Sequence, residues 1–147
     1  MKKEEALVIE QTYRVPARKI WKAITSREEM QEWYFNLPEF KPEVGFTFQF
    51  LSGPDENRQY LHVCTITEVV AGQKLAYSWQ YDGYPGSTLV VFELFAEEEQ
   101  TRLRLTHKGL ETLPDDTPDF ARANFEAGWN WIIGTALKEY AEKANVQ

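Results

Sequence analysis

The fold is decided by residues 119–143, DFARANFEAGWNWIIGTALKEYAEK, which form the longest helical pattern in the chain. Apolar residues recur there at intervals of three and four, the spacing of one stripe along a helix; they are Phe125, Trp129, Ile133, Ala136, Leu137 and Tyr140. Asp119 stands where an N-cap is expected, and Lys138 and Lys143 lie near the C-terminal end, where cations suit the helix dipole. A stripe of this length requires an apolar surface to pack against.

Five strand patterns precede this helix. Apolar and polar residues alternate in most of them, and one is nearly continuous in apolar residues; the segments are 46–50, 60–67, 75–81, 88–96 and 101–107. The turns between them are short and polar or rich in Gly and Pro; they fall at 52–57, 71–72, 82–86 and 97–100. Connections this short favour an antiparallel meander.

The residues before the meander add one strand and two short helices. Residues 7–13, LVIEQTY, are rich in β-formers, and Pro16 ends that strand and opens a helix over 17–24. Ser26 with Glu29 three residues later matches a capping box and predicts a second helix to about residue 33 or 34. Residues 36–45 hold Pro38 and Pro42 and indicate a loop.

The predicted architecture is therefore α+β. A curved six-stranded antiparallel sheet has one face that must be covered, and the helix at 119–143 is the only predicted element long enough to cover it. Such a sheet wrapped around one helix leaves a wedge-shaped space between the two. That space is either packed solid or a ligand cavity, and the residue pattern is compatible with both.

Length and charge exclude several classes of protein. A chain of 147 residues has the size of one domain, which we expect to span residues 1–147. Its net charge of −7 argues against nucleic-acid binding through a basic surface. The single cysteine, Cys64, excludes an intramolecular disulfide and fits a reducing compartment. No run of about 18 apolar residues occurs, so we expect a cytoplasmic protein without membrane insertion.

Six short motifs, taken in order, give the chain a family resemblance. They are IWKAIT at 20–25, WY at 33–34, VGFTF at 44–48, KLAYSW at 74–79, TRLRLTH at 101–107 and GW at 128–129. Over about residues 7–142 the chain resembles the Activator of Hsp90 ATPase homologue 1-like family, within the START-like (SRPBCC, Bet v 1-like) superfamily. The resemblance implies the helix-grip fold, with a hydrophobic cavity between the sheet and the C-terminal helix. The superfamily uses that cavity for lipids, sterols, aromatic polyketides and other apolar molecules.

Two features depart from the family pattern. The family commonly has a double glycine where this chain has Gly45 and Phe46, a difference that bears on the cavity entrance or on the packing there. The co-chaperone activity of eukaryotic members depends on a further N-terminal domain with an Asn- and Trp-rich motif, and no such motif occurs in this sequence. The family name is therefore not taken as a function.

The resemblance also predicts which side chains line the cavity. The expected ligand-binding residues are Trp33, Phe46, Phe48, Tyr77, Trp79, Phe92, Leu105, His107, Phe125, Trp129, Ile133 and Tyr140. The resemblance further implies that Phe50, Val90, Leu94, Leu103 and Leu137 point inward with them, and that Tyr34 helps Trp33 to close one end. The simpler alternative is that these residues form a solid core. Tyr77, Trp79 and Tyr140 each need a hydrogen-bond partner if buried, which a ligand or a water molecule could supply.

His107 shares a strand face with Leu103 and Leu105 and has two interpretations. It could orient a ligand or act as a general base, or it is a structural histidine satisfied by backbone groups. His62 and Cys64 share another strand face, but zinc needs three or four ligands. We therefore predict no metal, no cofactor and no assigned catalytic residue, and we interpret Cys64 as a small core residue.

The acidic residues lie mostly in predicted turns and loops, where exposure to water accounts for their charge without a catalytic role. Glu93 is out of phase with Phe92 and Leu94, so we expect it to face solvent beside Arg102 or Arg104. The sequence contains no Gly-rich phosphate loop, no Gly-x-Ser-x-Gly elbow and no His-Glu-x-x-His motif. These absences argue against a familiar hydrolase or nucleotide-dependent enzyme.

Three functions remain open. The first is a binding protein for an apolar small molecule, lipid-like or aromatic, held between the sheet and the C-terminal helix. The second is a cyclase, dehydratase or hydrolase of the same superfamily, in which His107 and a cavity tyrosine carry out acid–base chemistry. The third is an interaction protein associated with an Hsp90-type chaperone. A homodimer is also an option, because the edge strands of a sheet need protection.

Overall fold

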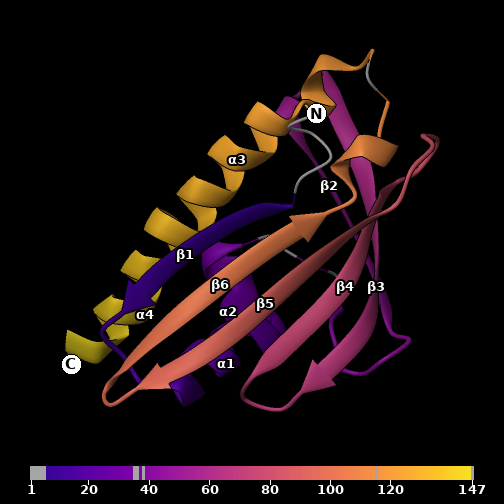
Figure 1. Ribbon diagram of the computed structural model, residues 1–147. Helices are drawn as coiled ribbons and strands as arrows, with labels where there is room; N and C mark the ends of the chain where they lie inside the picture. Colours follow the sequence, from indigo (N-terminus) through magenta and orange to yellow (C-terminus); the bar gives the residue numbers. More distant parts are fainter. Residues whose placement is uncertain (1–5, 35–36, 38, 115, 147) are drawn as a thin grey trace.

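The computed structural model describes residues 6–34, 37, 39–114 and 116–146 (Figure 1). Its elements are, in chain order, β1 (Leu7–Tyr13), α1 (Ala17–Thr25), α2 (Arg27–Trp33), β2 (Thr47–Asp55), β3 (Arg58–Val70), β4 (Lys74–Tyr81), β5 (Thr88–Glu97), β6 (Gln100–Lys108), η2 (Leu110–Thr112), η3 (Pro118–Phe120), α3 (Arg122–Trp131), η4 (Ile132–Ala136) and α4 (Leu137–Val146). Of the predicted loop at 36–45, Asn36 and Pro38 lie outside the described residues.

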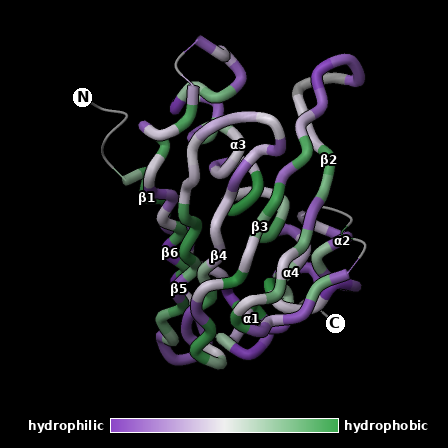
Figure 2. Tube along the Cα trace, turned by 90° about the vertical axis from the view of Figure 1, so that its right-hand side faces the viewer, coloured by the Kyte–Doolittle hydropathy of each residue, from purple (hydrophilic) through white to green (hydrophobic). Residues whose placement is uncertain are grey.

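The six strands form one antiparallel sheet in the order β1-β6-β5-β4-β3-β2. Strands β2 to β6 follow one another as the predicted meander, and β1 closes the far edge by pairing with β6, with Leu7 opposite His107 and Tyr13 opposite Thr101. Along β6 every second residue from Thr101 to His107 is buried. Along β5 the apolar residues are nearly continuous, and Figure 2 shows hydrophobic residues on both of these strands.

The helices gather on one side of the sheet. Figure 1 shows α3 and α4 following one another beside β1, while α1 and α2 lie behind the sheet in the same view. The Tyr13 hydroxyl joins β1 to the long helix by donating to the Ile133 carbonyl at 2.6 Å, and the Trp33 indole N–H joins α2 to α1 by donating to the Ala23 carbonyl at 2.9 Å. The predicted helix-grip arrangement, with two short helices between the first two strands, is confirmed.

The C-terminal helix differs from its prediction at its start and in its middle. The predicted N-cap at Asp119 is wrong: Asp119 lies in η3, and α3 begins at Arg122 with Ala121 as its N-cap. In the middle, residues Ile132–Ala136 form a π-helical turn. The buried stripe ends at Ala141, and Tyr140 is only half-buried.

The predicted capping box at the start of α2 is also wrong in its chemistry. Ser26 does occupy the N-cap position, with extended backbone angles, but its side chain makes no capping hydrogen bond. Instead, Glu28 and Glu29 place negative charge in the first turn of the helix. Carboxylates in that position stabilise a helix N-terminus through its dipole, so α2 begins where predicted for a different reason.

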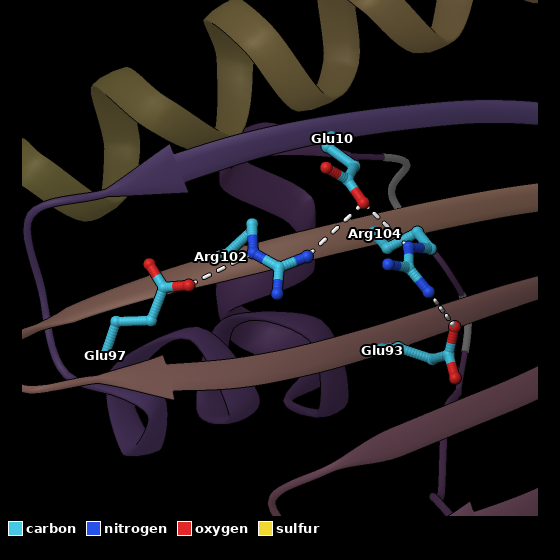
Figure 3. A network of polar contacts seen from close by, with 5 residues as sticks. All are labelled: Glu10, Glu93, Glu97, Arg102 and Arg104. Atoms are coloured by element: carbon cyan, nitrogen blue, oxygen red, sulfur yellow. Dashed lines mark hydrogen bonds and ion pairs between the residues drawn. The ribbon is translucent and has the colours of Figure 1, made fainter.

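The opposite face of the sheet carries a charged network (Figure 3). Glu10 on β1 accepts from Arg104 at 2.7 Å and from Arg102 at 3.3 Å, and Arg102 also reaches Glu97 at 3.1 Å. The predicted neighbour of Glu93 is confirmed as Arg104, at 4.0 Å across β5 and β6. Exposed ion pairs of this kind contribute little to stability. This face is therefore occupied by solvated charge, and apolar groups gather on the helix side.

Candidate functional site

A cleft of about 500 Å³ lies between α3 and the strands β2, β3 and β4. Its apolar wall is formed by His62, Trp79, Tyr81, Phe125, Trp129 and Ile132. The strand residues converge because of register: His62 pairs with Tyr81 across β3 and β4, and Trp79 lies two residues from Tyr81 on the same face. Phe125 and Trp129 lie one turn apart on α3 and face them.

His62 is held inside this wall by other rings. Its imidazole stacks on Phe50 with ring centroids 4.5 Å apart, and it meets Trp79 and Tyr81 at 5.0 and 4.7 Å. The Nδ1–H group donates to the Tyr60 carbonyl at 2.9 Å. Burial lowers the pKa of His62 to about 4, so the ring is neutral at pH 7 and contributes an aromatic surface to the cleft.

A polar rim closes one side of the cleft. Asp119 in η3 accepts from the Tyr60 hydroxyl at 2.6 Å through one carboxylate oxygen and from Arg58 at 3.1 Å through the other. The hydrogen bond to Asp119 is the main cause that raises the pKa of Tyr60 to about 12. Phe120, next to Asp119, stacks on Tyr81 with centroids 4.3 Å apart, which seats η3 against the sheet. Ser52 and Asn124 add a hydroxyl and an amide to the lining.

His107 does not line this cleft. It is fully buried, and its Nδ1 atom accepts from the Trp129 indole N–H at 3.0 Å. The Nε2–H group therefore donates to Thr88 Oγ1 at 2.8 Å, and that hydroxyl in turn donates to the Trp79 carbonyl at 2.8 Å. Burial lowers the pKa of His107 to about 3. The expectation that backbone groups satisfy this histidine is wrong, because both of its partners are side chains.

The space between the sheet and the middle of the long helix is filled. The hydroxyls of Tyr34 and Tyr77 lie 2.7 Å apart, and Phe48 packs edge-on against Tyr77 at 5.1 Å. Among the described residues, every buried side-chain nitrogen and oxygen has a hydrogen-bond partner. The protein itself therefore supplies the partners sought for Tyr77 and Trp79; the Trp79 indole N–H donates to the Tyr81 hydroxyl at 2.9 Å.

The structure divides the twelve predicted lining residues into three groups. Three of them line the cleft: Trp79, Phe125 and Trp129. The buried core beside it contains Trp33, Phe48, Tyr77, Phe92, Leu105, His107 and Ile133. Phe46 and Tyr140 are half-buried at the edges of the core, where burial and a hydrogen bond to Glu29 raise the pKa of Tyr140 to about 12.

The residues of the polar rim, Arg58, Tyr60 and Asp119, were not among the predicted lining residues. The alternation of β3 already placed Tyr60 on the face of His62, so this residue had a detectable signal. No sequence pattern predicted the contact between Arg58 and Asp119. These residues are 61 positions apart along the chain, and their contact depends on how η3 packs against the sheet.

The remaining candidates are the single cysteine and clusters of metal-ligating side chains. Cys64 is a buried residue of the hydrophobic core, as predicted, and burial raises the pKa of its thiol. Over the described part of the chain, no three His, Cys, Asp or Glu side chains come close enough together to hold a metal ion. Nor does any helix in that part have both the length and the apolar composition required to cross a bilayer.

Comparison with known proteins relates the chain to one family and one fold. The sequence model of the family described as "Activator of Hsp90 ATPase homolog 1-like protein" matches residues 14–142. No curated protein matches the chain significantly.

Solved structures share the architecture. Protein MLL2253 from Mesorhizobium loti is 24% identical with a TM-score of 0.73, over 95% of this chain and 98% of that one. Mll3558 from Rhizobium loti is 18% identical with a TM-score of 0.79, over 92% and 96%. DynU16, from the dynemicin biosynthetic locus, is 19% identical with a TM-score of 0.76, over 95% of this chain and 48% of its own. This chain thus spans about half the length of DynU16, and likeness at these identities establishes the fold.

Proposed function

Since the chain belongs to the Activator of Hsp90 ATPase homolog 1-like family, we propose that it binds an apolar aromatic small molecule between its sheet and its C-terminal helix. The observation that carries this proposal is the cleft of about 500 Å³ between α3 and β2–β4. Ligand sites in proteins are concave and mostly apolar, with a few polar groups that fix orientation. The wall of rings and the rim around Asp119 have this composition.

Three of the predicted lining residues are proposed to contact the ligand directly: Trp79, Phe125 and Trp129. The two indoles lie 5.6 Å apart, centroid to centroid, and both N–H groups are already bonded within the protein. Their rings therefore offer apolar surface without an unpaired donor, which suits a flat aromatic molecule. The nine other predicted residues are proposed to act indirectly, by keeping these rings in place.

Gly128 lines the cleft, and its lack of a side chain is further support for a ligand site there. It lies in the interior of α3, where glycine costs about 0.5–1 kcal/mol relative to alanine. A Cβ atom added there would meet no other atom within 4 Å, so packing does not require a glycine. The missing side chain instead leaves the wall of the cleft free, and a ligand can approach the helix backbone at this point.

Binding is favoured over acid–base catalysis by the state of the two histidines. Both ring nitrogens of His107 are engaged by Thr88 and Trp129, away from the cleft. His62 does line the cleft, but burial lowers its pKa to about 4, which makes it a weak base at pH 7. A general base must also reach the proton that it removes, and His107 is held away from the cleft by its two partners.

The test is a titration with the neutral naphthalene dye Prodan, followed by its fluorescence. The protein is expected to bind the dye saturably and to shift its emission to shorter wavelength. Gly128→Leu fills part of the cleft and should weaken binding at least about tenfold, a loss of about 1.4 kcal/mol. Ala127→Leu introduces the same side chain at the preceding position, which is exposed and does not line the cleft, and this variant should bind as the wild type does. Equal affinities for the two variants would contradict the proposal.

A further inference from the structure

Four hydroxyl or indole donors belong to the aromatic side chains that line the cleft, those of Tyr60, Trp79, Tyr81 and Trp129. The Tyr60 hydroxyl donates to a carboxylate oxygen at 2.6 Å. The Trp79 indole N–H donates to the Tyr81 hydroxyl oxygen at 2.9 Å, and the Trp129 indole N–H donates to an imidazole nitrogen at 3.0 Å. Three of the four donors are therefore engaged within the protein, and the fourth is the O–H group of Tyr81.

The hydrogen bond between Trp79 and Tyr81 has only one possible direction. An indole nitrogen donates and does not accept, so the Tyr81 oxygen is the acceptor and its own proton is directed elsewhere. Within the part of the chain that the structure describes, that proton has no acceptor. Burial raises the pKa of Tyr81, so the hydroxyl keeps this proton at pH 7. Tyr81 therefore carries one unused donor, even though its oxygen has a partner.

The ring of Tyr81 is held in place by its neighbours. The residue is 6% exposed, and its ring stacks on Phe120 with centroids 4.3 Å apart and meets His62 at 4.7 Å. Pairing with His62 across β3 and β4 fixes the backbone as well. A hydroxyl on a ring packed in this way does not reach a new acceptor by a change of rotamer. Since both Tyr81 and its donor Trp79 line the cleft, a molecule in the cleft is the natural source of that acceptor.

An unused donor at this place discriminates between ligands. A buried donor without an acceptor is costly, and a ligand group that displaces water without replacing its hydrogen bond loses affinity. A hydrocarbon group seated against the Tyr81 hydroxyl incurs this loss. A carbonyl oxygen accepts the proton and brings no proton of its own that needs a further acceptor. Sites built to hydrogen-bond one group of a ligand reject analogues that lack it.

We propose that the ligand is an aromatic carbonyl compound and that the Tyr81 hydroxyl donates a hydrogen bond to its carbonyl oxygen. The inference rests on the proposed function and adds the chemical class of the ligand. Trp79 acts here as a positioning residue, because its N–H group occupies the tyrosine oxygen and leaves the hydroxyl proton for the ligand. The apolar wall then holds the ring system, and this one hydrogen bond fixes its orientation.

The test compares two naphthalenes of nearly equal shape. Acetylnaphthalene carries a carbonyl group, and in isopropenylnaphthalene a methylene group replaces the carbonyl oxygen. Equilibrium dialysis gives the dissociation constant of each, and the ratio of the alkene constant to the ketone constant is compared between proteins. Tyr81→Phe removes the donor and should lower this ratio at least about tenfold. The Trp79 N–H group that the variant frees lies behind the lost hydroxyl, and the ketone reaches it only by moving into that space.

Tyr84→Phe is the matched control. It makes the same change in a ring that contacts Phe120 at 5.1 Å but does not belong to the lining of the cleft, and it should keep the wild-type ratio. A second measurement needs no variant: the infrared carbonyl band of acetylnaphthalene should lie at lower frequency in the wild-type complex than in an alkane solvent, because a hydrogen bond weakens the carbonyl bond.

The outcomes separate this inference from the proposed function. If neither naphthalene binds the wild type, the proposed function fails, and this inference fails with it. If both bind but Tyr81→Phe leaves the ratio unchanged, or Tyr84→Phe lowers it as far, the cleft remains a binding site and the donor role of Tyr81 is overturned. A carbonyl band at its alkane frequency in the wild-type complex would overturn that role in the same way.

Discussion

The indole N–H of Trp129 donates a hydrogen bond to Nδ1 of His107 across 3.0 Å. Because an indole nitrogen can only donate, this contact fixes the histidine as the tautomer that carries its proton on Nε2. The Nε2–H group then reaches Thr88, whose hydroxyl reaches the Trp79 carbonyl. One chain of hydrogen bonds thus connects the Trp129 indole through the core to the backbone of Trp79, and His107 is a positioning residue for the Trp129 ring and for that strand.

Thr88→Val tests that chain. Valine has nearly the same shape as threonine but leaves the His107 Nε2–H group without its acceptor, and an unsatisfied buried donor costs about 1–3 kcal/mol. The free energy of unfolding, measured by urea denaturation, should fall by that amount. Thr65→Val removes a hydroxyl from the exposed Thr47–Thr65 contact and should change it by less than about 0.5 kcal/mol. Similar losses in the two variants would contradict the assigned role of Thr88.

The two buried histidines should make the protein less stable in acid. Burial lowers the pKa of His107 to about 3 and that of His62 to about 4, from a model-compound value of 6.5. In the unfolded chain both rings take up a proton as the pH falls through 6.5, whereas the folded protein does not. Stability is therefore full above pH 6.5 and declines toward pH 4, by about 1.4 kcal/mol per pH unit for each ring.

Urea denaturation between about pH 7 and pH 5 measures this slope. His107→Gln removes one of the two contributions, so the slope should decrease by about 1.4 kcal/mol per pH unit even though the variant is less stable throughout. An unchanged slope would show that His107 takes up its proton in the folded protein as readily as in the unfolded chain.

Gly53, near the end of β2, is predicted to tolerate no side chain without a shift of the backbone opposite it. A Cβ atom added there would lie 1.6 Å from the Arg58 carbonyl oxygen, at a point where the strand register shifts. Gly53→Ala must displace the backbone that carries Arg58, and the free energy of unfolding should fall by about 1–3 kcal/mol. Gly128→Ala is the matched control, because its Cβ has open space and it should stabilise α3 by about 0.5–1 kcal/mol. Effects of the same sign would contradict this contrast.

The sheet and the helices could be predicted because their signals are local. Period-two alternation and short polar turns define β2 to β6 within a few residues of chain each, and the apolar stripe defines α3 and α4 in the same way. One local signal was overlooked. The buried residues Phe125, Trp129, Ile133, Leu137 and Ala141 are spaced by four, which on an α-helix of 3.6 residues per turn drifts by about 40° per step. The π-helical turn η4 absorbs part of this drift and keeps the stripe on the sheet.

The position of the cleft could not be predicted, because it depends on how rings from distant segments share one volume. Trp33, Tyr34, Phe48 and Tyr77 belong to three separate elements, and together they fill the middle of the wedge. The open space is left at the other end, beside Asp119. No spacing rule places that residue against Tyr60, 59 positions away along the chain.

The most direct test is a proton–nitrogen correlation spectrum of the labelled protein during titration with naphthalenemethanol. The chain has five tryptophans, and their indole N–H signals report separately on five places in the fold. The signals of Trp79 and Trp129, together with the backbone amide of Gly128, should shift in a saturable manner, while those of Trp21, Trp33 and Trp131 stay in place. Shifts confined to the last three indoles, or no shift at all, would contradict binding in this cleft.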